Sequence, residues 1–434
     1  MTTLRHLDLS KTFFVMGLLS LVSLSGCSSF GKGVAEAVLE KSDTEDKRLC
    51  QVWGSSFSGM APALEKHEGK TKVLMVHGVG NNLPGYSTEF LEKLAKELNL
   101  TVRSRDHKDI PLIPSPLFPE KNLGNLRVTR LLSADRLQEM LFYELTWSEI
   151  TREQKALLGF DNSGDYSFRR AELNNLLKIF ANDTGPDPII YLGESRKDIL
   201  NAFVQSFCWM AQGDWDDLPD NGSGKRACTG FDDKHLKHIV RDDYVMVALS
   251  LGSRITVDGM QAIASILEST TDGRSTAVGE KALRMIDALR NKRIPIYMLA
   301  NQLPMLQLGR ELPEVSGQSA AYCNAGGANY QSRMLTQTSI IAFSDPNDLI
   351  SYAIPPGFSE KYLDSRLCVD VTNININIAS VIDAFGLGKF ANPLDAHLGY
   401  GKDDRVIALI AHGIGNNHAS PLVKEKCLWT ELID

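Results

Sequence analysis

Ser250 stands at the end of an apolar run, with the small residues Ala248 two positions before it and Gly252 two positions after it. A serine that leaves a buried strand in a sharp turn needs little bulk at these two positions, because the backbone there lies against neighbouring segments. Such a turn presents the hydroxyl as a nucleophile, provided that a base takes its proton. The usual pattern has glycine in the first position. Ala248 is therefore a departure, and an ordinary strand-to-helix turn is the alternative.

Two aspartates and two histidines downstream are candidates to complete a proton-transfer chain with this serine. Asp345 and Asp348 follow an apolar run that ends at Phe343. Asp345 precedes a proline, where an aspartate commonly shapes a turn. His397 lies past the last clear strand-like run, and His412 directly follows a further apolar run that is itself a candidate strand. A histidine can move protons near neutral pH, and a carboxylate can orient it and stabilise its charged form.

Apolar runs and helix-like segments alternate over about 300 residues, which predicts an α/β fold with a mostly parallel sheet and helices on both faces. The predicted strands lie at 72–76, 101–104, 140–147, 243–249, 294–299, 338–343 and 369–378. The predicted helices lie at 87–98, 171–179, 198–210, 255–267 and 280–290. Prolines after residue 110 interrupt regular structure. Alternating Asn and Ile in 369–378 predict a strand with one wetted face. Ligands bind such sheets at the carboxyl ends of the strands, where the candidate residues lie.

The segment 77–82, His-Gly-Val-Gly-Asn-Asn, closes the first of these strands. The chain therefore carries, in order, a His-Gly loop, a serine, an aspartate and a histidine, each at the end of a strand. This order resembles the α/β-hydrolase superfamily, whose catalytic residues run serine, acid, histidine along the chain. The resemblance covers about residues 72–410 and is interrupted by cap-like insertions at about 148–190 and 213–238.

The resemblance implies that Ser250 is the nucleophile, His397 the base and Asp348 the acid that orients the base. Asp348 is preferred because the superfamily's acid commonly stands just before an apolar run, as it does here. Asp345 and His412 stay open as alternative catalytic residues.

An acyl-transfer site also needs two fixed N–H donors for the charge that develops on the attacked carbonyl oxygen. By the same resemblance these donors are the backbone amides of Val79, in the His-Gly loop, and of Leu251, after the nucleophile. The alternative is that the glycines of the loop only allow a tight turn beside the sheet.

The first residues have the pattern of a targeting segment. Arg5 and Lys11 precede an uncharged apolar run at 12–24, which is shorter than the roughly 20 residues of a membrane span. The run ends in Leu-Ser-Gly-Cys27, which resembles the lipobox of bacterial lipoproteins. This resemblance implies a signal peptide at 1–26, palmitate-type lipidation of Cys27 and, with Ser28 following, an outer-membrane address. Residues 27–71 then form a tether and N-terminal arm, and 72–434 the hydrolase domain.

Composition narrows the class of protein further. The 434-residue chain is 43% hydrophobic with a formal net charge of −7, and its charges are mixed, which argues against nucleic acid as a partner. Six cysteines besides Cys27 predict up to three disulfides in an oxidising compartment, with Cys208 and Cys228 as the preferred local pair. No Cys/His spacing suggests zinc, and the acidic stretch 214–217 lacks the spacing of a calcium loop.

These observations together predict a lipid-anchored serine hydrolase of the bacterial envelope that cleaves an ester of a lipid or another acyl substrate. No metal and no organic cofactor is implied. An acyltransferase or thioesterase would use the same residues, and an inactive binding or scaffold lipoprotein on the same fold is the alternative of a different class.

Overall fold

The structure is a computed structural model that describes residues 48–66, 69–162, 171–228, 233–269, 284–285, 287–383, 389–415 and 417–430. The predicted signal peptide and Cys27 lie outside the described residues, as do 280–283 and 286 of the helix predicted at 280–290. Among the described residues, no helix has the length and apolar character needed to cross a membrane.

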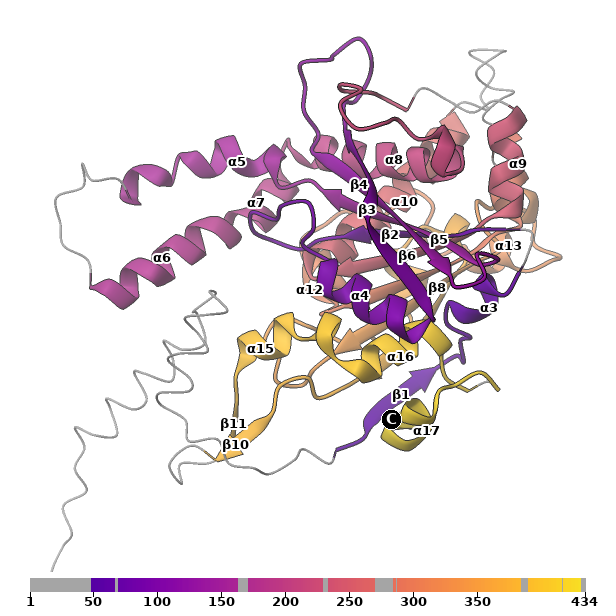
Figure 1. The fold of residues 1–434 in the computed structure, drawn as a ribbon. Coiled ribbons are helices and arrows are strands. Elements are labelled where there is room, and N and C mark those ends of the chain that lie inside the picture. The colour runs from indigo at the N-terminus through magenta and orange to yellow at the C-terminus, as the bar shows by residue number, and fades with distance from the viewer. Residues whose placement is uncertain are drawn as a thin grey trace, which may run out of the picture.

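A ten-stranded mixed sheet forms the centre of the molecule (Figure 1). In spatial order its strands are β12 (Cys427–Trp429), β1 (Cys50–Gly54), β9 (Val369–Asn375), β8 (Gln337–Ser344), β7 (Arg293–Leu299), β6 (Asp243–Leu249), β2 (Thr71–Val76), β5 (Glu139–Thr146), β4 (Asn125–Ser133) and β3 (Leu100–Pro111). The six strands from β9 to β5 are parallel to one another. The prediction of an α/β fold with a mostly parallel sheet is therefore confirmed.

The register of the central strands aligns their carboxyl ends. Val76, the last residue of β2, lies opposite Ala248 on β6 and opposite Leu145 on β5. Residues that follow these strands therefore meet at one edge of the sheet, where α/β proteins bind their ligands.

Helices cover both faces of the sheet, because successive residues of a buried strand point to opposite sides. Leu74 belongs to one apolar core, with α8 (Arg196–Gln212) and α10 (Leu251–Ser269). Its neighbour Val73 belongs to a second core on the other face, with α4 (Thr88–Glu97) and α16 (Asp404–His412). Further α-helices among the described residues are α3 (Ala61–Leu64), α5 (Glu149–Ala156), α6 (Glu172–Thr184), α7 (Pro186–Leu192), α9 (Asp233–Arg241), α12 (Leu303–Gln307), α13 (Ser319–Cys323), α14 (Phe358–Tyr362), α15 (Pro393–Leu398) and α17 (Pro421–Lys426), and residues 287–290 are helical as well.

One edge of the sheet differs from the sequence prediction. The short strand expected at 101–104 is a twelve-residue strand, β3, which runs on to Pro111 and pairs antiparallel with β4. Pro111 is tolerated here because it is the last residue of the outermost strand, where the missing N–H removes no hydrogen bond from the interior of the sheet.

At the opposite edge the sheet contains β1, which lies in the segment 27–71 that the sequence analysis assigns to the tether and N-terminal arm. β1 lies inside the sheet between β9 and β12, and Cys50 is bonded to Cys427. The other disulfides join Cys323 to Cys368 and Cys208 to Cys228, the pair preferred from the sequence.

The wetted face predicted for β9 is also partly wrong. Asn373 is buried, and its side chain exchanges two hydrogen bonds with the backbone of Ile354, which covers the strand. An asparagine can line a buried face when a neighbouring loop satisfies its amide.

Candidate active site

Ser250 occupies the turn between β6 and α10 with a positive φ of 53°. A non-glycine residue in this region is strained, and it persists only where the surrounding structure holds it. Here the Ser250 N–H donates to the carbonyl of Leu299 (2.9 Å). Gly252 is required, because a Cβ there would collide with the backbone carbonyls of Val76 and His77. Ala248 is fully buried, so the small methyl group is accommodated at the position where glycine is usual.

The turn places Ser250 against His397. The Oγ of Ser250 lies 3.0 Å from Nε2 of His397, and Nδ1 of the same ring lies 3.0 and 2.9 Å from the two carboxylate oxygens of Asp348. The carboxylate fixes the tautomer in which Nδ1–H donates to Asp348 and Nε2 accepts from the serine hydroxyl. All three side chains are buried, with exposed fractions of 2% for Ser250, 8% for His397 and 5% for Asp348.

Elements far apart in the sequence carry the acid and the base. Asp348 follows β8, and His397 lies on α15, a short helix whose N-cap Asn392 accepts a hydrogen bond from Leu394 N. Sequence reasoning missed Tyr400, whose hydroxyl donates to Asp348 Oδ2 (3.2 Å). Burial and the nearby Asp348 carboxylate raise the pKa of Tyr400, so the phenol stays protonated as a donor.

The structure places neither Asp345 nor His412 in this cluster. Asp345 accepts the backbone N–H groups of Ile378 (2.6 Å) and Ala379 (3.0 Å), and therefore joins two loops. His412 ends α16, which is a helix and not the candidate strand at 405–411, and its Nε2 lies 3.2 Å from Glu97. That helix buries an apolar stripe on the sheet, which explains why its sequence also resembles a buried strand.

The glycine-rich loop lies directly against the nucleophile. A Cβ at Gly78 would come within 2.8 Å of the Ser250 Cβ, so this contact requires glycine. Val79 follows in the same loop. Leu251 is the first residue of α10, and the N–H of a first helical residue has no partner within its helix. The backbone donors predicted from the sequence therefore lie on the two segments that meet at Ser250.

His77, the residue before Gly78, holds this loop in place through hydrogen bonds and a ring contact. Its Nε2 accepts the N–H of Trp147 (3.1 Å), and its Nδ1–H donates to the Gly78 carbonyl (2.7 Å). The imidazole stacks on the Trp147 indole with ring centroids 4.7 Å apart. Burial lowers the pKa of His77 from 6.5 to about 3, so the ring is neutral and plays a structural part.

This neutral histidine predicts a loss of stability in acid. Between about pH 6.5 and pH 3 the unfolded chain binds a proton at His77 and the folded chain does not, so the free energy of unfolding falls as pH falls, by up to ~1.4 kcal/mol per pH unit. Denaturant unfolding of wild type and His77→Gln between pH 7 and pH 4 should show a shallower slope for the variant. Equal slopes would contradict the prediction.

The insertion at 148–190 holds the other side of the glycine-rich loop. Asp187 of α7 is fully buried and accepts the Gly80 N–H (2.7 Å), and Lys155 of α5 lies 2.8 Å from that carboxylate. Asp183 accepts the N–H of Asn81 (3.2 Å). The insertion, which the sequence indicated only as a cap, therefore fixes the loop through a buried ion pair.

Exposed apolar side chains accompany the segments that form the cluster. Leu83 follows the glycine-rich loop, Leu349 and Ile350 follow Asp348, and Leu398 follows His397. The insertion adds exposed Phe160. Scattered exposed leucines are normal, but here each of these segments carries an exposed apolar side chain close by in the sequence, and we refer to these five side chains together as the apolar rim.

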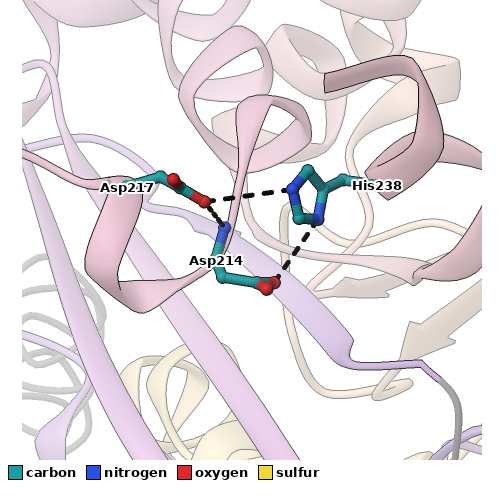
Figure 2. A group of neighbouring side chains, drawn as sticks. All are labelled: Asp214, Asp217 and His238. Carbon is teal, nitrogen blue, oxygen red and sulfur yellow. Dashed lines mark hydrogen bonds and ion pairs between the residues drawn. The ribbon is translucent and has the colours of Figure 1, made fainter. Parts of the chain in front are cut away.

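Asp214, Asp217 and His238 form a second polar cluster (Figure 2). His238 turns one ring nitrogen toward each carboxylate, so a single ion could not use both nitrogens. Arg241 lies 2.6 Å from Asp214, and Lys234 contacts Asp217, so both carboxylates are already neutralised. The cluster also lies at the amino end of β6, away from Ser250. These contacts are those of an ion-pair cluster.

No model of a known protein family matches the chain, and neither a curated protein nor a solved structure matches it. The geometry of the site therefore carries the functional argument.

Proposed function

We propose that the protein is a serine hydrolase that cleaves carboxylic esters through an acyl-enzyme on Ser250. The observation that carries this proposal is the hydrogen-bonded chain from Ser250 through His397 to Asp348, with contacts of 3.0 and 2.9 Å. A nucleophile, a base within hydrogen-bond reach and an acid that orients the base are the parts that acyl transfer by serine requires.

The chemistry follows from the geometry. Ser250 Oγ attacks the ester carbonyl while its proton passes to His397 Nε2, and Asp348 stabilises the imidazolium. The backbone N–H groups of Val79 and Leu251 bind the oxyanion. His397 then protonates the leaving alcohol, which leaves an acyl group on Ser250. Water attacks this ester and gives a proton to His397, which passes that proton to Ser250 Oγ as the acid is released and the free serine is restored.

An α/β-hydrolase fold is part of the proposal. The strained serine turn after a central parallel strand supports it, and so does the chain order of serine, aspartate and histidine. The antiparallel strand β4 beside β5 is compatible with the same fold family.

The apolar rim supports a lipid or another acyl chain as the substrate, since it would bury apolar surface when such a chain enters. The lipobox-like Leu-Ser-Gly-Cys27 supports a lipid-anchored protein of the outer membrane. An anchored protein lies close to membrane lipids, which carry acyl groups. The mechanism needs no metal, no organic cofactor and no nucleic acid.

A fluorophosphonate probe tests the nucleophile. Wild type should be labelled, and Ser250→Ala should lose the label, because the probe reacts with an activated serine hydroxyl. Ser253→Ala is the matched control: Ser253 is buried one turn further on, and its hydroxyl donates to the Ser250 carbonyl (2.6 Å). Labelling should survive in this control. Undiminished labelling of Ser250→Ala would refute the proposal.

A further inference from the structure

Three arginines surround one buried aspartate beside the proposed nucleophile. The carboxylate of Asp258 lies 2.5 Å from Arg254, 2.6 Å from Arg310 and 3.1 Å from Arg196. Tyr191 donates its hydroxyl to the same carboxylate (2.7 Å). Burial alone would raise the pKa of Asp258, but the three guanidinium groups lower it to about 2.

The charges of this cluster do not balance. Asp258 is the carboxylate that these three arginines contact within the described part of the chain, so three cations face one anion and leave a surplus of two positive charges. A buried cation is costly unless an anion compensates it. The surplus therefore favours a further anion at this place.

Donor hydrogens of the cluster are also unused. Four buried nitrogens have no hydrogen-bond partner among the described residues: Nε of Arg196, Nε of Arg254, Nη1 of Arg310 and Nε2 of Gln307. Arg254 is 2% and Gln307 6% exposed, and the two are hydrogen-bonded to each other (2.8 Å). Buried donors normally have partners, so these are free to bind a ligand that supplies acceptors.

The cluster lies close to the candidate active site. Arg254 follows Ser250 by four residues, which is about one helical turn or ~6 Å along α10. Tyr191 likewise follows Asp187, the residue that holds Gly80, by four residues within α7. Arg310 is largely buried and Arg196 is partly exposed, so the cluster reaches from the buried layer to solvent.

We propose that Arg196, Arg254 and Arg310 form a binding site for a phosphate monoester. A phosphate monoester carries nearly two negative charges at neutral pH and offers three acceptor oxygens, which matches the surplus of two charges and the unused donors. The planar fork of a guanidinium binds phosphate with parallel hydrogen bonds. A carboxylate would neutralise only one of the two charges.

Calorimetry tests the site without turnover. The full chain carrying Ser250→Ala is titrated with inorganic phosphate and with glycerol 3-phosphate, and saturable binding at one site is expected. Arg310→Gln in this background should weaken the affinity at least about tenfold, because one charge-assisted pair is lost. Arg196→Gln should do the same, and its partly exposed side chain makes it the safer variant for folding.

Arg127→Gln is the matched control, because Arg127 pairs with Asp109 of the edge strand β3, away from the arginine cluster. Its affinity should equal that of the parent. The proposal would be overturned if no saturable binding of phosphate were seen. It would also be overturned if the Arg310→Gln and Arg196→Gln variants bound phosphate as tightly as the Ser250→Ala parent.

A second arm identifies the source of the phosphate and rests on the proposed function. Wild type is assayed with a monoacylglycerol and with its 3-phosphate. If the phosphate belongs to the substrate, the phosphorylated ester should have the lower KM, and inorganic phosphate should compete with it. If free phosphate is the ligand, inorganic phosphate should change the rate at which the neutral ester is hydrolysed, and it should do so without competing with that ester for the site. Failure of the proposed hydrolysis would leave the calorimetric result intact.

Discussion

Replacing His397 with glutamine is expected to lower kcat/KM for a carboxylic ester by about 10⁴-fold or more, because the variant lacks the base that takes the Ser250 proton. Asp348→Asn should cost a similar factor, since an amide would hold the imidazole in the wrong tautomer. Both changes should leave binding of a substrate analogue nearly unaltered. Steady-state kinetics with a chromogenic ester measures the effect.

His412→Gln is the matched control for the histidine. This side chain is paired with Glu97 at the end of α16, away from the cluster, so its loss should change kcat/KM by less than about threefold. A large loss in His412→Gln together with an active His397→Gln would exchange the two assignments and contradict the account.

Asp187→Ala is expected to lower both stability and activity. Removing the carboxylate leaves the buried Lys155 cation with only its longer contact to Asp183 (3.7 Å), and the loss of a buried partner typically costs about 3–5 kcal/mol. It also frees the Gly80 N–H, so the loop that carries the oxyanion donor loses its anchor, and kcat should fall more than KM rises. Denaturant unfolding and steady-state kinetics measure the two effects.

A double variant separates these two effects. Asp187→Leu with Lys155→Met replaces the ion pair by apolar groups, which should recover most of the stability, while kcat stays low because Gly80 still lacks its acceptor. Asp183→Ala, which loses a hydrogen bond to Asn81 and a longer, partly exposed ion pair with Lys155 (3.7 Å), should cost less, about 1 kcal/mol. Full recovery of kcat in the double variant would show that Asp187 has no positioning role.

Local patterns in the sequence were enough to predict the centre of the fold. The apolar run before Ser250 is a strand and the periodic segment after it is a helix, since burial on one or both faces fixes each period. The preference for Ser250, Asp348 and His397 rests on a resemblance to the order and positions of the catalytic residues in the α/β-hydrolase superfamily, and the structure brings these three side chains together.

Contacts that depend on tertiary packing could not be predicted from the sequence. Lys155, Asp187 and Gly80 meet over sequence separations of 32 and 107 residues, and no local pattern marks a buried ion pair. Tyr400 is not predicted from the sequence because nothing nearby in the chain shows that Asp348 lies beside it. The strand β1 was missed because five residues carry too little periodicity, and its place follows from pairing with β9 and β12.

Peptide mapping of the trapped acyl-enzyme tests the central claim most directly. Wild type is mixed with an activated carboxylic ester, quenched in acid within the first turnover, digested and analysed by mass spectrometry. The account predicts that the peptide containing Ser250 gains the mass of the acyl group, and that Ser250→Ala gains none. An acyl group on another residue, or ester cleavage with no acylated peptide in a quench that resolves the first turnover, would contradict it.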